Sequence, residues 1–305
     1  MNNKNKLNPY YITGFTDAEG CFKINIRKPL ALREINKKWS VEPIFAIDLH
    51  IRDLPLLIKI QDYFGAGYIH KTSDNKKATF IVSSTKDIIK YIIPHFDKYP
   101  LLTKKRGDYE IFKKIIELKS NKENLTNDNI QKIVNLKAAL NLGLSQKLKD
   151  CFPNTIPAEK PIVEIPEYID PNWIVGFSEG EGNFYVSISE SKAYKTGSLV
   201  QLKFRIGQHE RDTLLLNNLV KVLNIGKVEQ NTESLVIFIV TKLNDVVEKI
   251  IPLFDKYPLQ GIKAMDYNDF KEVAKLMEKK AHLTDSGLQQ IIEIKNKMNK
   301  KRNYD

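Results

Sequence analysis

Carboxylate side chains gather at one place in each half of the sequence, where a short helix is expected to end. Asp17 and Glu19 stand in GFTDAEG, and Glu179 and Glu181 stand in GFSEGEG. A negative charge in the last helical turn opposes the helix dipole, at a cost of about 0.3–1 kcal/mol. A divalent cation would offset this cost, and Mg²⁺ needs few protein carboxylates when substrate phosphates supply its other ligands. For one such segment alone, a solvated acidic helix end is the alternative.

Both ends of each acidic helix are marked in the sequence. Asn8-Pro9 and Asp170-Pro171 provide an N-cap residue followed by proline at the first helical position. Gly20 and Gly182 provide the glycine that commonly ends a helix. We therefore expect a short helix before each of these glycines and a strand directly after it.

Each of these helices also contains a glycine in its middle, Gly14 or Gly176. A missing side chain allows a second backbone to approach closely. If the two helices pack on each other about a pseudo-twofold axis, Glu19 and Glu181 arrive side by side at its end.

The acidic segments belong to a longer internal repeat. IIPHFDKYPL (92–101) recurs as IIPLFDKYPL (250–259), and the offset of 158 persists to the pair Asn141 and Asn299. Upstream, single insertions change the offset to 159 and then to 162. The matching upstream segments are HIRD (50–53) with HERD (209–212), and NPYYITGFTDAEG (8–20) with DPNWIVGFSEGEG (170–182). The chain is therefore predicted to contain one fold twice.

The repeat sets the predicted domain organisation. We expect a first half at 1–150, a proline-rich and extended linker at 151–170, and a second half at 171–305. In each half, alternating residues predict a strand after the acidic helix, at 21–28 or 183–189, and a second strand, clearest at 199–206. A helix capped by Asp53 or Asp212, two further strands and three helices follow. The further strands are expected at 67–72 and 78–83, and at 226–231 and 235–241. The fold class is α+β, with the order αββαββα twice and two antiparallel sheets.

The strand alternation gives each sheet one apolar and one polar face. On the polar side we expect Lys, Asn, Arg, Gln, Ser and Tyr side chains. An ordinary solvated face would show the same alternation. Two such faces joined as a pseudo-dimer would instead form one long polar and basic groove.

Net charge points to a nucleic-acid partner for that groove. The 305 residues carry a formal charge of +11, and residues 1–150 hold 27 basic and 16 acidic side chains while residues 151–305 hold 21 of each. Lysine outnumbers arginine 41 to 7, which suits contact with phosphates more than with base edges. The basic run at 297–302 is expected to be a solvated tail, and His50 and His209 to be structural or to face phosphate.

Composition excludes several other classes of protein. No apolar run approaches the roughly 18 residues of a membrane span. Two cysteines, Cys21 and Cys151, give no disulfide framework and no CxxC zinc site, and the five histidines form no HExxH. The first residues, MNNKNKLNPYY, lack a secretory or presequence pattern. Any metal is therefore expected to be held by carboxylates.

With both motifs and the repeat in view, the chain resembles the LAGLIDADG homing endonucleases, in the monomeric form with two motifs in one chain. GFTDAEG (14–20) and GFSEGEG (176–182) match the two signature motifs, and the resemblance covers nearly the whole chain. It implies two tandem repeats that form a pseudo-twofold dimer, with the two antiparallel sheets as a DNA-binding saddle. It implies a site-specific endodeoxyribonuclease that uses Mg²⁺ to cut both strands of a long double-stranded target and leaves 3′ overhangs.

The resemblance also implies roles for individual residues. Glu19 and Glu181 would be the essential metal ligands, assisted by the backbone carbonyls of Ala18 and Gly180. Lys105 and Lys263, which the offset of 158 relates, would lie near the cleaved phosphates. Gln208 would organise water, although the first repeat has Leu49 there. The expected DNA-contacting residues are Lys23, Asn25, Arg27, Tyr185, Ser187, Ser189, Gln201, Lys203 and Arg205.

Other functions remain open at this point. An intron maturase would bind intron RNA, with or without cutting DNA, and a two-domain regulator would bind DNA without cutting. A carbohydrate hydrolase with paired carboxylates fits the basic groove poorly. Family habit and the richness in Lys, Asn and Ile suggest a fungal mitochondrial intron as the origin of the gene.

Overall fold

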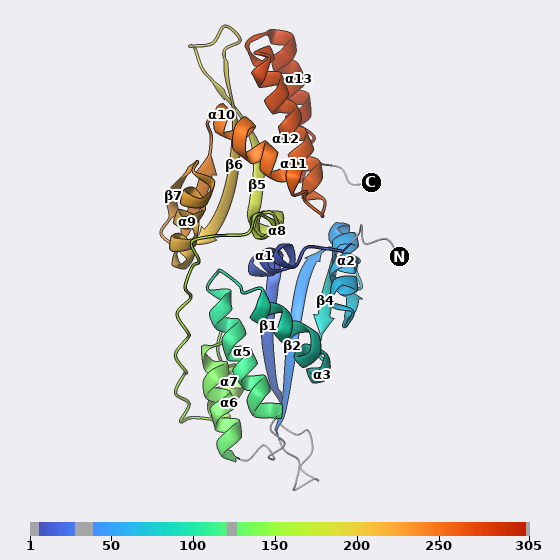
Figure 1. Cartoon of the computed structure of the whole chain (residues 1–305), viewed down its shortest axis with the longest axis vertical. Coiled ribbons are helices and arrows are strands. Elements are labelled where there is room, and N and C mark those ends of the chain that lie inside the picture. Colours follow the sequence, from blue (N-terminus) through green and yellow to red (C-terminus); the bar gives the residue numbers. More distant parts are fainter. Residues whose placement is uncertain (1–5, 28–38, 121–126, 303–305) are drawn as a thin grey trace. The chain divides into compact units, whose positions relative to one another are not determined.

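The computed structural model describes residues 6–27, 39–120 and 127–302, and it contains the predicted elements twice (Figure 1). In the first repeat the helices and strands are α1 (Pro9–Glu19), β1 (Gly20–Arg27), β2 (Ser40–His50), α2 (Leu54–Phe64), β3 (Tyr68–Lys71), β4 (Lys77–Val82), α3 (Thr85–Asp87), α4 (Ile93–Lys98), α5 (Lys105–Ser120), α6 (Asn127–Ala139) and α7 (Gln146–Cys151). In the second they are α8 (Pro171–Glu181), β5 (Gly182–Glu190), β6 (Ser198–His209), α9 (Thr213–Leu223), β7 (Lys227–Thr232), β8 (Leu235–Val240), α10 (Leu243–Asp245), α11 (Ile251–Lys256), α12 (Lys263–Glu278) and α13 (Asp285–Lys295).

Each repeat builds one four-stranded antiparallel sheet, which confirms the predicted fold class. The strand orders are β1-β2-β4-β3 and β5-β6-β8-β7, so the first strand of each repeat lies at a sheet edge. The pairings correspond between the sheets, since Gly20 lies opposite Ile47 and Gly182 lies opposite Ile206. Within the described residues, no helix is both long and apolar enough to cross a membrane.

The chain divides into two compact units whose boundaries do not follow the repeats. The first unit contains Met1–Pro9 and Glu19–Glu164, and the second contains Tyr10–Ala18 and Ile165–Asp305. Most of helix α1 therefore belongs to the second unit, whereas the strand that follows it belongs to the first. The division falls inside the segment 151–170 that the sequence suggests as a linker.

An aromatic cluster forms the core between sheet and helices in each unit. The ring of Phe22 lies within 5.4 Å, between centroids, of four other aromatic rings. These rings are Phe45, Phe96, Tyr109 and Phe112, and their counterparts around Phe184 are Phe204, Phe254, Tyr267 and Phe270. Burying a phenylalanine contributes about 1.5–3 kcal/mol, so these clusters are a main reason why each unit is stable.

The helices cover the apolar face of each sheet because their apolar residues recur every three or four positions and so lie on one side of the helix. In α2, Leu56, Leu57, Ile60 and Phe64 are buried, and α9 buries Leu215, Leu216 and Leu219. The opposite face of each sheet carries the polar side chains of the strands. The sheet therefore presents a row of polar groups on a rigid support.

Asparagine side chains protect the edge strands β1 and β5. Asn141 donates its side-chain amide to the carbonyl of Phe22 at 2.7 Å, and Asn299 donates to the carbonyl of Phe184 at 3.1 Å. Both asparagines have φ near +50°, a left-handed conformation that asparagine tolerates better than most residues. The sequence offset pairs these two residues, but it did not indicate this role.

One expectation for local structure is confirmed, and another, the caps at Asp53 and Asp212, is wrong. Helix α8 ends directly before Gly182, as expected, and this glycine is extended, with φ −73°. A glycine is needed there because a Cβ would lie 2.5 Å from the carbonyl oxygen of Ser178. The turns before α2 and α9 are capped by histidine, since Nδ1 of His50 and of His209 accepts a backbone N–H two residues later, and no cap hydrogen bond comes from Asp53 or Asp212.

The expected solvated tail is also wrong for Arg302. Its guanidinium is only 10% exposed and donates to Asp266 at 2.8 Å and to Asp269. The spacing of basic residues at 297–302 could not reveal this, because both acids lie more than 30 residues earlier in the sequence.

Candidate functional site

Helices α1 and α8 are in direct backbone contact through their central glycines, as the sequence predicts. Within the second unit, a Cβ on Gly14 would lie 2.1 Å from the carbonyl oxygen of Trp173. A Cβ on Gly176 would lie 2.1 Å from the carbonyl oxygen of Tyr11. No real side chain fits at such distances, so both positions require glycine while the helices stay in contact.

Two of the four acidic side chains of the motifs stabilise this helix pair. Asp17 is 3% exposed and accepts a hydrogen bond from Nε1 of Trp173 at 2.8 Å. Glu179 is 7% exposed and accepts one from the hydroxyl of Tyr11 at 3.0 Å. Aromatic donors of the facing helix therefore satisfy these two carboxylates.

Burial dominates the electrostatics of Glu179. It raises the pKa of this carboxyl above the ordinary value, although backbone N–H groups of Gln260 and Gly261 and the charge of Lys263 act in the opposite direction. The N–H of Gln260 donates to Oε2 of Glu179 at 2.7 Å. The carboxylate therefore connects α8 to the segment that leads into α12.

Glu19 and Glu181 are the last residues of α1 and α8, and both are partly exposed. A strand begins at the next residue in each case, Gly20 or Gly182. Among the described residues, no group of three or more His, Cys, Asp or Glu side chains is arranged to hold a metal ion. Each of these helix ends therefore carries one partly exposed glutamate directly before a strand.

Lys263 is fixed at the end of α8 by the carbonyl groups there. Its Nζ donates to the carbonyl oxygens of Ser178 at 3.1 Å, Gly180 at 2.8 Å and Gly182 at 2.6 Å. The last carbonyls of a helix lack intrahelical partners, and a lysine is well suited to satisfy them. A positive charge thus lies against the backbone on both sides of Glu181.

Lys105 occupies the corresponding position in the first unit, as the first residue of α5. Its backbone N–H donates to Oγ1 of Thr103 at 3.2 Å. Its charge also acts on the thiol of Cys21, two residues after Glu19, where burial nevertheless raises the thiol pKa. Lys105 therefore lies near the start of β1, as Lys263 lies near the start of β5.

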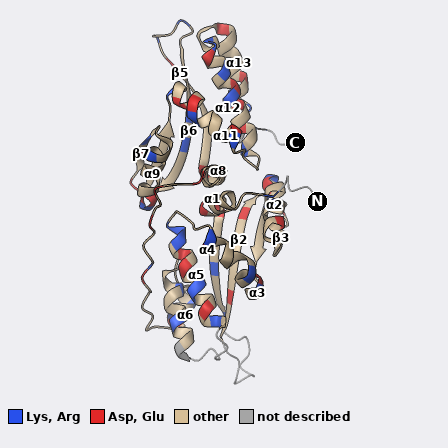
Figure 2. Cartoon of the chain, viewed as in Figure 1, with Lys and Arg blue, Asp and Glu red and all other residues tan. Residues whose placement is uncertain are grey.

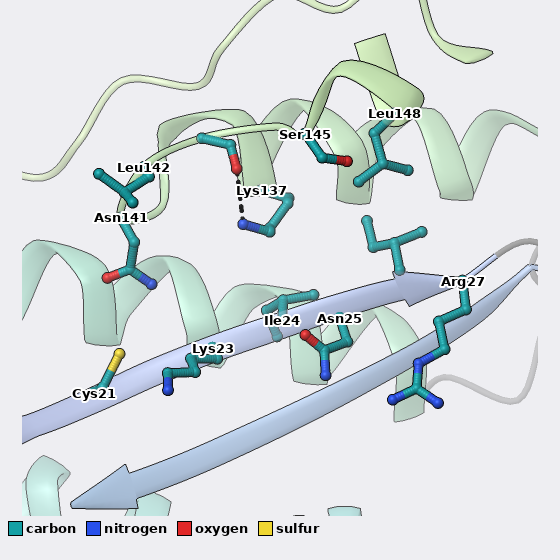
Figure 3. A pocket seen from close by; sticks show the side chains of 12 residues that line it. Cys21, Lys23, Ile24, Asn25, Arg27, Lys137, Asn141, Leu142, Ser145 and Leu148 are labelled. Carbon is teal, nitrogen blue, oxygen red and sulfur yellow. Dashed lines mark hydrogen bonds between the residues drawn. The ribbon is translucent and has the colours of Figure 1, made fainter. Parts of the chain in front are cut away.

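The first sheet presents Lys23, Asn25 and Arg27 along the edge strand β1 (Figure 3). Lys23 and Arg27 are exposed, and Arg27 forms an ion pair with Glu42 on β2 at 3.1 Å. These three residues also line a cavity of about 700 Å³ between β1 and the segment that includes α6 and α7. Lys137 lies on the opposite side of this cavity, where its Nζ donates to the carbonyl of Gly143 at 2.9 Å.

The second sheet brings its six predicted contact residues together on β5 and β6. Strand pairing places Tyr185 opposite Lys203 and Ser187 opposite Gln201, while Ser189 lies opposite Leu199 on the same face. The guanidinium of Arg205 lies 5.5 Å from the ring centroid of Tyr185. Its Nε is buried and has no hydrogen-bond partner in the part of the chain that the structure describes. The guanidinium of Arg205 is therefore held against an aromatic ring on the polar face of the sheet.

Gln208 is not brought to this face. It lies opposite the buried Val236 and shares its side of β6 with the core residues Phe204 and Ile206. The alternation along the strand therefore separates it from Lys203 and Arg205.

Two exposed lysines on the polar faces were missed by the sequence analysis. Lys77 on β4 lies opposite His50, and Lys227 on β7 lies opposite Ile239. The alternation of the third and fourth strands could have indicated them, but those strands are short and their boundaries were only approximate.

Comparisons with known proteins agree on one family. A family model described as LAGLIDADG endonuclease matches residues 12–116 and 174–274. A Neurospora crassa protein named "Probable intron-encoded endonuclease 2" is 42% identical over 96% of this chain, and "Probable intron-encoded endonuclease 3" of the same organism is 36% identical over 94%. The chain spans 65% and 53% of these two relatives.

Solved structures match almost the whole chain. I-SmaMI bound to cleaved DNA superposes with a TM-score of 0.92 at 39% identity, covering 98% of this chain and 99% of that one. I-LtrWI bound to target DNA gives a TM-score of 0.91 at 40% identity, covering 97% and 98%. I-SmaMI has also been solved on uncleaved DNA in the presence of calcium ions, with a TM-score of 0.91 at 39% identity over 97% and 100% of the two chains.

Proposed function

The chain belongs to the LAGLIDADG endonuclease family, and on that premise we propose that it is a site-specific homing endonuclease. It would make a double-strand break with 3′ overhangs in a long DNA target. The observation that carries this proposal is the repetition of one arrangement. In each repeat a partly exposed glutamate ends a helix, directly before the first strand of a sheet with a polar face. Matched halves suit a substrate with two strands to cut.

Glu19 and Glu181 would hold the divalent metal, together with the carbonyl groups of Ala18 and Gly180. Their chemistry fits Mg²⁺, because all these donors are hard oxygens and Mg²⁺ keeps several waters and substrate phosphates in its shell. When bound, the metal supplies the charge that polarises a phosphodiester and lowers the pKa of a water molecule.

Lys105 and Lys263 would stabilise negative charge on the phosphates during cleavage. The hydrogen bonds of Lys263 to the end of α8 support this role, because they hold its ammonium group close to Glu181 before any substrate binds. A fixed charge needs little reorganisation when the reaction begins. Gln208, which is half-buried near the end of β6, would organise water at the site.

The polar faces of the two sheets would read the bases in the major groove, where all four base pairs can be distinguished. Arg205 is the strongest candidate, since its guanidinium lies over the ring of Tyr185 on the polar face of the second sheet. Lys23 and Asn25 would do the same from β1 in the first sheet, and Arg27 would reach phosphate or base from its pair with Glu42.

We further propose that the enzyme acts as a monomer encoded in a fungal mitochondrial intron. Two repeats in one chain provide both halves of the site, so no second chain is needed. The names of relatives support the origin, since several are intron-encoded and one is described as lying in ND4 intron 1 of Podospora anserina.

Incubation of the full chain with a randomised duplex DNA library and Mg²⁺ tests the proposal. Glu19→Gln or Glu181→Gln should abolish double-strand cleavage while DNA affinity stays within about tenfold, because the change removes a metal ligand and leaves the sheets intact. Glu190→Gln, the same change at the exposed end of β5, is the control and should cut normally. Full cleavage by either motif variant would refute the metal assignment. Failure of the wild-type chain to cut any sequence, with tight binding of intron RNA, would favour a maturase instead.

A further inference from the structure

A second cavity of the first unit lies on its helical layer, away from the polar strand face. It measures about 720 Å³, which is within the range of small-molecule pockets. It is formed by the end of α2, the helical segment around α4 and residues 6–9. Among the described residues that line it there is no Asp or Glu. The lining side chains that matter here are Tyr63, Tyr91, His95, Tyr99, Lys6 and Lys90.

Aromatic rings in mutual contact form one wall of this cavity. The ring centroids of Tyr63 and His95 are 5.4 Å apart, and those of His95 and Tyr99 are also 5.4 Å apart. The hydroxyl of Tyr63 and Nδ1 of His95 are joined by a hydrogen bond of 3.0 Å. Burial lowers the pKa of His95 to about 3, so the imidazole is neutral at physiological pH. The wall is therefore ordered, uncharged and aromatic.

Lysine ammonium groups lie over the outer rings. Nζ of Lys90 is 4.9 Å from the ring centroid of Tyr91, and Nζ of Lys6 is 6.0 Å from that of Tyr63. Both lysines are exposed. Aromatic faces stack on bases of any sequence, and neighbouring cations attract the phosphates of the same strand. Stacking rings, lysines and the absence of acidic lining residues together suit a nucleotide.

The second repeat shows that the fold does not require this lining. Its backbone elements are the same, and Pro94 and Tyr99 keep their counterparts Pro252 and Tyr257. The other aromatic and basic side chains do not persist. By the sequence offsets, Tyr63 corresponds to Val222, Lys90 to Glu248, Tyr91 to Lys249 and His95 to Leu253.

We propose that the cavity of α2 and α4 binds an unstacked nucleotide of a single-stranded nucleic acid, with the base against the tyrosine rings and the phosphates beside Lys6 and Lys90. The bases of an intact duplex are stacked on each other and cannot enter it. The site is therefore distinct from the strand faces proposed for the double-stranded target. Single-stranded RNA and single-stranded DNA share this chemistry, and the experiment separates them.

Fluorescence anisotropy of the full chain with a labelled twelve-nucleotide oligouridine and with the matching deoxyuridine strand, in EDTA, tests the proposal. The variant Lys90→Glu/Tyr91→Lys installs the side chains of the second repeat at two surface positions. It should weaken binding of the single strand about tenfold or more, because the tyrosine ring that stacks on a base is lost and the charge at position 90 is reversed. Lys86→Gln, four residues earlier and outside the cavity, makes the same net charge change as the double variant and is the matched control. It should change affinity less than about threefold.

Further arms distinguish the site from the strand face and identify the strand. Excess random duplex DNA should leave most of the single strand bound, and a 5-iodouridine strand should cross-link to Tyr63, Tyr91 or Tyr99. Tighter binding of the oligouridine identifies RNA as the ligand. Equal binding of the two oligonucleotides shows that the site accepts single-stranded RNA and single-stranded DNA alike. Equal weakening by the double variant and by Lys86→Gln, or complete displacement by duplex DNA, would overturn the proposal. None of these readouts depends on DNA cleavage, so the site and the nuclease proposal can fail separately.

Discussion

In the first sheet the basic side chains Lys23 and Arg27 lie on the edge strand β1, whereas in the second Lys203 and Arg205 lie on the inner strand β6. The positions of β2 that correspond to the latter pair hold Ile44 and Ala46. The apolar faces, by contrast, keep the same aromatic residues in both repeats. Packing against the helices therefore restricts which residues occur on the apolar side of each strand. The residues on the polar side can differ between the halves.

Most of the positive charge of the first half lies away from the polar face of its sheet. On the polar face of its sheet, three basic residues stand among two acidic ones, and two of the three are paired: Arg27 with Glu42, and Lys77 with Asp48 at 3.7 Å. Most of the net +11 of residues 1–150 therefore lies outside this face. Figure 2 shows basic residues along α5 and α6 of this half. Lys6 and Lys90, which line the second cavity, are among the basic residues that lie outside the sheet face.

The largest expected effect tests a feature that the repeats share. Gly14→Ala or Gly176→Ala would place a Cβ 2.1 Å from a backbone oxygen of the facing helix, so each should lower the free energy of unfolding by about 3–5 kcal/mol. Gly207→Ala on β6 is the control, since the nearest atom to its Cβ is 3.7 Å away, and its stability should stay within about 1 kcal/mol. Urea denaturation measures all three. A stable Gly14→Ala protein would contradict the contact between α1 and α8.

A smaller effect should separate the repeats at an equivalent aspartate. Asp266 pairs with the 10% exposed Arg302, while its counterpart Asp108 pairs with Lys160, which is 41% exposed, at 2.6 Å. Arg302→Ala should cost about 3 kcal/mol because it leaves a buried carboxylate unpaired. Lys160→Ala should cost less than about 1 kcal/mol because solvent already screens that pair. Equal losses in thermal or urea unfolding would show that the two pairs are alike after all.

The pH dependence of stability should depend on a histidine that one repeat has and the other lacks. The buried His95 has its pKa lowered to about 3, whereas the unfolded chain takes up a proton near the ordinary value of about 6.5. Stability is therefore fully present above pH 6.5 and is lost as the pH falls toward 3. His95→Leu, which copies Leu253, should reduce the loss between pH 7 and pH 4 by about 2–3 kcal/mol. Circular dichroism measures the unfolding of the wild-type chain and of His95→Leu at each pH. The same loss of stability in the two proteins between pH 7 and pH 4 would disprove this explanation.

The smallest expected effect concerns DNA affinity and the unequal strands. Arg205→Ala should weaken binding of the cleavage target by about 1–3 kcal/mol if its guanidinium contacts a base. Arg27→Ala should have a smaller effect, because Glu42 already offsets this charge at 3.1 Å. Anisotropy titrations over a range of salt concentrations measure both. A larger loss for Arg27→Ala would reverse our assignment of the more specific contact.

The sequence was sufficient for the architecture because every strand and most helices occur twice. An offset of 158 that persists from residue 92 to residue 141 cannot arise from chance, so the repeat determined the predicted element order. The alternation around Phe22 and Phe184 assigned the strand faces. Gly14 and Gly176 were correctly interpreted because a glycine in mid-helix has few other uses. The site residues Glu19, Glu181, Lys105 and Lys263 remain proposals that rest on the family motif and on their positions in each unit.

The remaining features depended on contacts between residues far apart in the sequence. Asp17 and Glu179 could not be separated from Glu19 and Glu181 by spacing, since only the facing aromatic donors Trp173 and Tyr11 distinguish them. The role of Arg302 depends on two acids of α12. Long-range pairing of this kind leaves no periodic signal.

One consequence follows from the position of helix α1. The chain enters the second unit at Tyr10, returns to the first at Glu19 and leaves it again after Glu164. Either repeat produced alone would therefore lack the facing helix against which its own glycine, Gly14 or Gly176, packs. Cutting the exposed segment at 156–168 should therefore leave two fragments that still purify together. The repeats are therefore not independent pieces of chain, because a helix that begins the first repeat completes the unit built by the second.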